Sequence, residues 1–197
     1  MKAVLMSVNP KWVEKIASGE KTIEVRKTMP KLERPFKCYI YATKPKKWFR
    51  FSSYGYASDE NLWLSNGKVK MSDGFEFWAG DKEYEPLCGK VIAEFVCDSV
   101  EMVNAGCSDY GIDLFYHDCM TKGCLTESEV DKYFNIPEDK DLRAMKGNGC
   151  AWHISQLKIY DKPKELFSFC TPLGKRPSYH LERPPQSWCY VEELQNG

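Results

Sequence analysis

The strongest chemical signal in the sequence is the segment Gly19–Arg26, which reads G-E-K-T-I-E-V-R. Glu24 and Arg26 are two residues apart, so in a strand their side chains point to the same face. Lys21 has the opposite parity and must reach that face from the turn that Gly19 permits. A lysine, a glutamate and an arginine that converge form an anion-binding fork with a candidate general base. The simpler alternative is a surface strand with a solvated ion pair worth under about 1 kcal/mol, and spacing alone favours it.

A second candidate region is the basic and aromatic segment that begins at Lys44 and continues to Tyr56. Single-stranded nucleic acids are bound by cations that contact phosphates and by aromatic side chains that stack on bases. The alternative is a strand whose aromatic side chains point inward and whose lysines point to solvent. The candidate ligand-binding residues of this segment are Lys44, Lys46, Lys47, Trp48 and Arg50.

The charge of the chain is unevenly distributed along the sequence. The full chain has 28 basic and 28 acidic residues, but residues 1–50 contain 13 basic and 4 acidic residues, a net charge of +9. A basic N-terminal quarter on an acidic body predicts a local anion-binding surface, with nucleic acid as the leading candidate. The alternative is that the asymmetry averages out when the chain folds.

The candidate binding residues must be positioned by strands and helices. The sequence of the N-terminal half predicts several such elements. Apolar residues 3–8 predict a buried strand. Asn9 as a cap, Pro10 at the first helical position and Gly19 at the exit predict a helix over residues 10–18. Strands are predicted at residues 22–26 and 37–43. Residues 44–87 predict a ribbon of short strands, with hairpin turns at the Asn-Gly and Asp-Gly pairs 66–67 and 73–74.

The C-terminal half predicts fewer and longer elements. One strand is expected over residues 90–103 and another over residues 149–160. Thr126 and Glu129 form a capping-box pattern that predicts a helix over residues 126–134. The proline-containing tail, residues 169–197, is expected to pack on the body as irregular chain. Because strands dominate and helices do not alternate with them, the sequence favours an α+β fold with a small mixed barrel.

Composition excludes several classes of protein. An aromatic content of 14% is too high for a disordered chain, and no apolar run approaches the length of a membrane helix. No signal-peptide pattern opens the sequence, so we expect a cytoplasmic protein. The nine cysteines have no C-x-x-C pair, and most are expected to be reduced. Cys107, His117, Cys119 and Cys124 match zinc spacing poorly, so we predict no metal and no cofactor.

The segment G-x-K-x-x-E-x-R, placed after an N-terminal strand and helix, resembles the signature of the ASCH domain family. Residues 88–103, 126–134 and 151–166 resemble the central strand, second helix and closing strand of that family. The resemblance covers about residues 1–44 and 88–168. It therefore predicts one ASCH domain over residues 1–168, with an insertion at about 45–87 and an extension at 169–197.

The resemblance implies a PUA-like small mixed β-barrel with short flanking helices, and a cleft lined by Lys21, Glu24 and Arg26. Family members are expected to bind RNA or nucleotides, and a few are enzymes. One branch hydrolyses acetylcytidine with a lysine at the position of Lys21, a threonine at that of Glu24 and a separate glutamate. Lys21 matches that branch and Glu24 departs from it.

The sequence and the resemblance together leave three candidate functions. The first is an RNA- or nucleotide-binding module that uses the two candidate regions above. The second is a hydrolase that acts on a modified nucleoside or RNA, in which Lys21 and Glu24 transfer protons and Arg26 holds an anionic group. The third is a protein-interaction domain, for which the sequence contains no positive motif. We expect no membrane partner.

Overall fold

The computed structural model describes residues 2–43, 88–103, 109–136, 138, 148–172 and 179–193, together with the backbone of six short strands between residues 48 and 86. The chain divides into two compact units. The first unit comprises residues 1–17, 38–94 and 158–197, and the second comprises residues 18–37 and 95–157. Each unit is described by itself.

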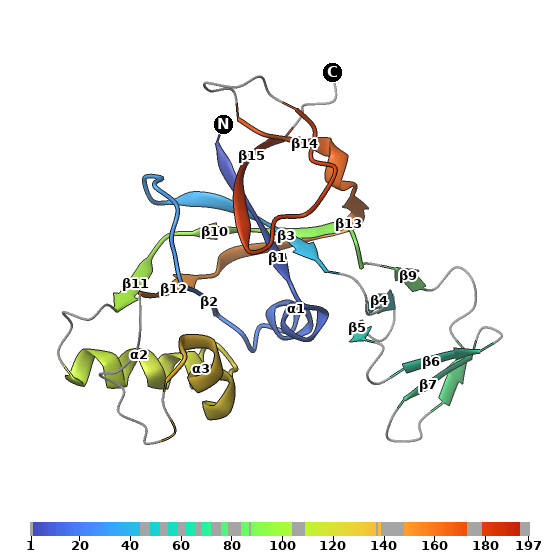
Figure 1. The fold of residues 1–197 in the computed structure, drawn as a ribbon. Helices are drawn as coiled ribbons and strands as arrows, with labels where there is room; N and C mark the ends of the chain where they lie inside the picture. Colours follow the sequence, from blue (N-terminus) through green and yellow to red (C-terminus); the bar gives the residue numbers. More distant parts are fainter. Residues whose placement is uncertain are drawn as a thin grey trace. The chain divides into compact units, whose positions relative to one another are not determined.

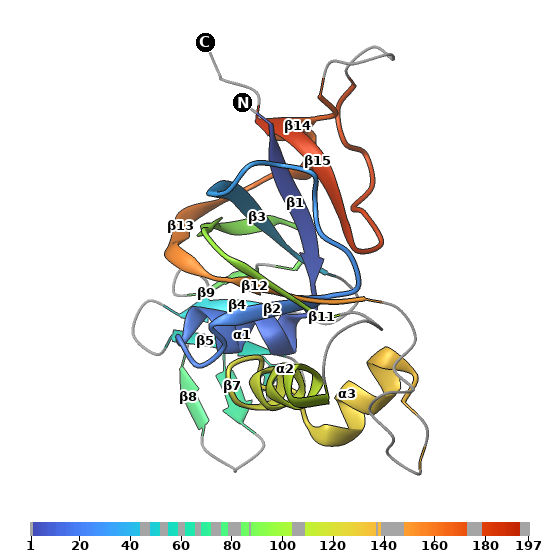
Figure 2. The same cartoon turned by 90° about the vertical axis from the view of Figure 1, so that its left-hand side faces the viewer.

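The first unit is built on a six-stranded mixed sheet (Figure 1). Its strands, in spatial order, are β13 (Ser155–Lys164), β10 (Val91–Cys97), β3 (Phe36–Ala42), β1 (Ala3–Val8), β15 (Trp188–Glu193) and β14 (Phe169–Cys170). β1 runs parallel to β3 and antiparallel to β15, and Figure 2 shows β1 between these two strands. Alternate residues of β1 and β3, among them Leu5 and Tyr39, join Phe169 and Val191 in a buried core on one face.

The expectation of an irregular C-terminal tail is wrong. The tail contains β14 and β15, and β15 pairs with β1 so that Leu5 lies opposite Cys189 and Met6 opposite Trp188. The backbone groups along that side of β1 need hydrogen-bond partners because β1 is buried, and the apolar run of β15 supplies them. The tail is therefore part of the central sheet of the first unit.

The N-terminal helix follows its sequence signals closely. Helix α1 (Pro10–Ala17) begins after Asn9, whose side-chain Oδ1 accepts a hydrogen bond from the Lys11 amide at 3.1 Å. Val13 and Ile16 are buried on one face. The prediction is confirmed to within one residue at the C-terminal end.

The segment between residues 48 and 86 contains two small antiparallel sheets. One has the order β5 (Gly55–Ser58), β4 (Trp48–Phe51), β9 (Tyr84–Pro86), and the other has β6 (Leu62–Ser65), β7 (Lys68–Met71), β8 (Glu76–Trp78). β6 pairs with β7 across residues 66–67, and β7 pairs with β8 across residues 72–75. Both predicted hairpins are confirmed.

The second unit combines a three-stranded sheet with two helices. The sheet has the order β11 (Val100–Val103), β12 (Gly149–His153), β2 (Ile23–Arg26), and helices α2 (Asp109–Thr121) and α3 (Glu127–Phe134) lie on the same side of it in both ribbon views (Figures 1 and 2). Ile23 and Val25 of β2 pack with Phe115 of α2 and Phe134 of α3 in one core. The capping box at the start of α3 is confirmed, with Thr126 and Glu129 bonded reciprocally.

Two predicted long strands are each broken in the structure. The strand expected over residues 90–103 is β10 and β11, separated by Asp98 and Ser99, and the strand expected over residues 149–160 is β12 and β13, separated by Ile154. The two breaks lie together, because the His153 amide donates to the Ser99 carbonyl at 3.0 Å and His153 Nδ1 lies 2.7 Å from Asp98 Oδ1. Among the described helices, none is long and apolar enough to cross a membrane.

Candidate functional site

The residues just before β2 are held at the C-terminal end of α2. The backbone amides of Thr22 and Ile23 both donate to the carbonyl of Lys122, at 2.9 and 3.3 Å. The carbonyl of Thr22 in turn accepts from the Ile154 amide at 2.9 Å. These contacts fix the turn that carries Lys21, and so they fix where the Lys21 side chain begins.

Lys21 is the most buried of the three candidate side chains, at 3% exposed. Its Nζ donates to the carbonyl of Gly123 at 2.6 Å, two residues beyond the last residue of α2. A cation there is favoured by the partial negative charge at a helix C-terminus. The same Nζ lies 3.6 Å from Glu24 Oε2.

Glu24 joins the lysine to the arginine. Its Oε1 lies 2.9 Å from Arg26 Nη2, while its Oε2 faces the ammonium of Lys21. The structure therefore brings Lys21, Glu24 and Arg26 together, and we call these three residues the motif cluster. Glu24 and Arg26 are 6% and 9% exposed, so the simpler interpretation of a solvated surface pair is wrong.

Burial on both faces of β2 explains that difference. In the antiparallel register, Glu24 lies opposite Trp152 and Arg26 opposite Cys150, and all four residues are buried. Alternation along a strand separates two faces but does not say which face is covered. The Trp152 ring also packs edge-on against Phe36, with ring centroids 5.8 Å apart. The charged side chains on the polar face of β2 therefore lie in a poorly solvated environment.

The motif cluster has unequal charges. Two cations share one carboxylate, which leaves a formal charge of +1. Glu24 Oε2 is buried and accepts no hydrogen bond within the described part of the chain, although Lys21 faces it. Chemically, the arrangement can attract an anion, and it places a carboxylate oxygen beside an ammonium that can exchange a proton with it.

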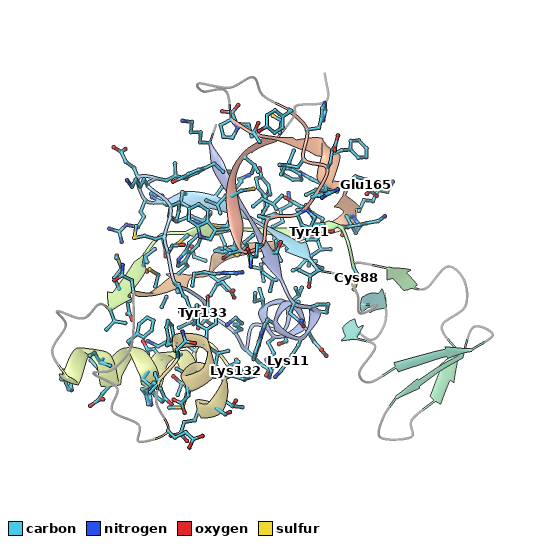
Figure 3. All side chains as sticks on the ribbon, in the orientation of Figure 1. Lys11, Tyr41, Cys88, Lys132, Tyr133 and Glu165 are labelled. Carbon is cyan, nitrogen blue, oxygen red and sulfur yellow. The ribbon has the colours of Figure 1, made fainter. Side chains whose placement is uncertain are left out.

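Two neighbours of the motif cluster were not predicted from the sequence. Tyr133 of α3, labelled in Figure 3, is partly buried, and the ammonium of Lys27 lies over its ring, 5.1 Å from the ring centroid. Burial raises the pKa of Tyr133, an effect that Arg26 opposes and Glu24 reinforces. Burial also raises the pKa of Cys119 to about 12, although the charge of Lys21 opposes this increase. Both groups are therefore neutral near pH 7 and available as hydrogen-bond donors.

The second candidate region is only partly described. Lys44, Lys46 and Lys47 lie outside the described residues. Trp48 and Arg50 lie in β4, where Trp48 pairs with Ser58 and Arg50 with Tyr56, and their side chains are not described. Cys107 of the weak zinc pattern is also outside the described residues, and elsewhere in the described ranges no three histidine, cysteine or acidic side chains gather as metal ligands.

Comparison with known families identifies the chain. The model of the ASCH domain matches residues 6–133, about two thirds of the sequence, including the motif cluster. The chain belongs to the ASCH domain family. ASCH domains are part of the PUA-like superfamily, and the family is generally thought to bind RNA. The family predicted from the G-x-K-x-x-E-x-R segment is confirmed, and so is the α+β, PUA-like fold class.

Solved structures similar to this ASCH domain come from Zymomonas mobilis. A serine-to-alanine mutant of an ASCH protein from that organism has a TM-score of 0.53 and 14% identity, and the match covers 98% of this chain and 89% of that chain. The unmutated protein has a TM-score of 0.47 and 15% identity, with coverage of 98% and 88%. At these identities the similarity shows the fold alone. No curated protein matches the chain.

Proposed function

We propose that this ASCH domain binds single-stranded RNA or a nucleotide, with phosphate groups drawn to the motif cluster and to the basic and aromatic segment that follows β3. The observation that carries the proposal is the excess positive charge of the motif cluster: Lys21 and Arg26 are both fixed against one carboxylate. A phosphate oxygen that approaches the cluster meets a net charge of +1 in a poorly solvated place, where electrostatic attraction is stronger than in water.

Substitution of Lys21 tests whether the motif cluster contributes to RNA binding. Lys21→Met keeps the apolar stem of the side chain and leaves Glu24 paired with Arg26, while the excess charge is removed; circular dichroism checks that the variant is folded. The affinity for a 12-nucleotide labelled single-stranded RNA, measured by fluorescence anisotropy, is expected to fall about tenfold, the effect of one charge-assisted hydrogen bond. Lys162→Met, which removes an exposed lysine of β13, is the matched control and should bind like the wild type. Equal affinity of the Lys21 variant and the wild type would contradict the role of the cluster.

A second function, hydrolysis of an acylated nucleoside, is favoured by one specific observation. Glu24 Oε2 is buried, accepts no hydrogen bond from a described residue, and lies 3.6 Å from Lys21 Nζ. A carboxylate oxygen in this state is suited to take a proton from an attacking water, and the ammonium is suited to give one to the leaving amine.

Acetylcytidine is the substrate to test, with cytidine and acetate followed by chromatography. Glu24→Gln keeps the shape of the side chain but cannot accept the proton, so turnover should fall by about 10²–10⁴-fold. Glu33→Gln changes an exposed glutamate in the same unit and should keep the wild-type rate. Absence of turnover in the wild type would eliminate this function, and full turnover in the Glu24 variant would eliminate Glu24 as the general base.

A further inference from the structure

The first unit contains a pocket whose lining residues include none of the three residues of the motif cluster. Its volume is about 440 Å³, within the range of about 300–1,000 Å³ that small-molecule sites occupy. Ser7 and Tyr41 are register partners on β1 and β3, and Thr43 follows with the same parity. These residues therefore share the core face of the six-stranded sheet. All residues that line the pocket belong to the first unit.

One wall of the pocket is formed by the C-terminal tail and is held in place by β1. Ser7 Oγ donates to the carbonyl of Pro185 at 2.6 Å, and the Ser7 amide donates to the carbonyl of Ser187 at 2.9 Å. Two consecutive prolines, Pro184 and Pro185, restrict the backbone of the same segment. The wall is therefore ordered without a ligand, which reduces the entropic cost of binding one.

The lining groups suit a planar, uncharged molecule with N–H donors. Because the Ser7 hydroxyl is used to hold the wall, the polar side chains that line the rest of the pocket are Tyr41, Thr43, Glu182 and Gln186. No lysine or arginine is among the described residues that line the pocket. Burial raises the pKa of Tyr41, and Cys88 and Glu165 add to this effect, so its hydroxyl is a neutral donor (Figure 3).

Leu166, Pro184 and Pro185 supply the apolar surface of the pocket. Pockets for nucleobases combine apolar surface against the ring faces with a few polar groups at the ring edge. The carboxylate of Glu182 accepts hydrogen bonds only, and it has two oxygens side by side. A ring that presents two adjacent N–H donors satisfies both oxygens at once.

We propose that this pocket binds the guanine base of a nucleoside, with Glu182 accepting from the N1–H and the 2-amino group. Guanine alone among the four RNA bases carries these two donors next to each other. Adenine and cytosine place a ring acceptor beside the amino group, and uracil flanks its single N–H with two carbonyl oxygens. This proposal does not depend on RNA binding by the motif cluster.

The test is isothermal titration of the full chain with guanosine and with inosine. Inosine lacks the 2-amino group, so it should bind about tenfold more weakly than guanosine, the effect of one hydrogen bond to a charged group. Glu182→Gln should weaken guanosine binding about tenfold and reduce the preference over inosine. Glu182 is exposed at the rim of the pocket, so this change should leave the fold intact.

Two control variants distinguish guanosine binding in this pocket from binding at the motif cluster or elsewhere on the surface. Glu33→Gln changes an exposed glutamate outside the pocket, and Lys21→Met changes the motif cluster, and both variants should bind guanosine like the wild type. The proposal is overturned by absence of guanosine binding at millimolar concentration, by equal affinity for inosine, or by an unchanged affinity of the Glu182 variant. Loss of guanosine binding in the Lys21 variant would also overturn it, since the ligand would then belong to the motif cluster.

Discussion

Replacement of Glu24 by alanine is expected to reduce the free energy of unfolding by about 3–5 kcal/mol, the typical cost of removing one partner from a buried ion pair. The variant leaves the cations of Lys21 and Arg26 without their shared carboxylate, in side chains that are only 3% and 10% exposed. Lys21 keeps its bond to the Gly123 carbonyl, but Arg26 loses the carboxylate at 2.9 Å. Urea denaturation followed by circular dichroism measures the loss.

A double variant separates the loss of the ion pair from general damage to the unit. Adding Lys21→Met to Glu24→Ala removes one of the two uncompensated cations, so the double variant should be more stable than Glu24→Ala alone. Glu33→Ala removes an exposed glutamate and should change stability by less than about 0.5 kcal/mol. A double variant less stable than Glu24→Ala would show that the charges of the motif cluster are not coupled.

The sequence predicted the members of the motif cluster but not their burial. Parity placed Glu24 and Arg26 on one face of β2, and the turn at Gly19 left Lys21 free to reach them. What covers that face depends on Trp152 and Cys150, which are more than 120 positions away in the chain and become neighbours only through sheet pairing. The local sequence pattern does not show which residues cover the polar face of β2. A solvated ion pair was therefore the simpler interpretation.

Two of the three helices were predicted well, and the helix between them in the chain was missed. Asn9 before α1 and the capping box before α3 gave boundaries within one residue of those observed. Helix α2 places Ile112, Phe115 and Cys119 on its buried face, at helical spacing. That spacing was a usable signal, although Gly111 lowers helix propensity near the start of the helix.

Sites formed by residues far apart in the sequence could not be predicted either, because those residues become neighbours only when the chain folds. The wall of the guanine pocket depends on a hydrogen bond between Ser7 and Pro185, which are 178 positions apart. Tyr133 was placed correctly in a helix, but the position of the Lys27 ammonium over its ring follows from how α3 packs on the sheet. Sequence pattern predicts elements and faces, whereas these contacts arise when the elements assemble.

RNA affinity is expected to fall steeply with salt, and this is the second prediction with a large effect. Four cations of the basic segment (Lys44, Lys46, Lys47 and Arg50) and the excess charge of the motif cluster allow about four to five phosphate contacts. For single strands, the slope of log affinity against log salt is about −0.7 per phosphate contact, so a slope near −3 is expected. Between 50 and 200 mM salt, affinity should therefore fall by about 60-fold.

The salt titration of the wild type is the most direct test that this ASCH domain binds RNA through phosphate contacts. Anisotropy of a labelled 12-nucleotide single-stranded RNA, measured from 50 to 200 mM KCl, should give the slope near −3. Lys21→Met should reduce the magnitude of the slope by about 0.7, because one phosphate contact is lost. An affinity that does not change with salt, or absence of RNA binding at the lowest salt, would contradict the proposed function.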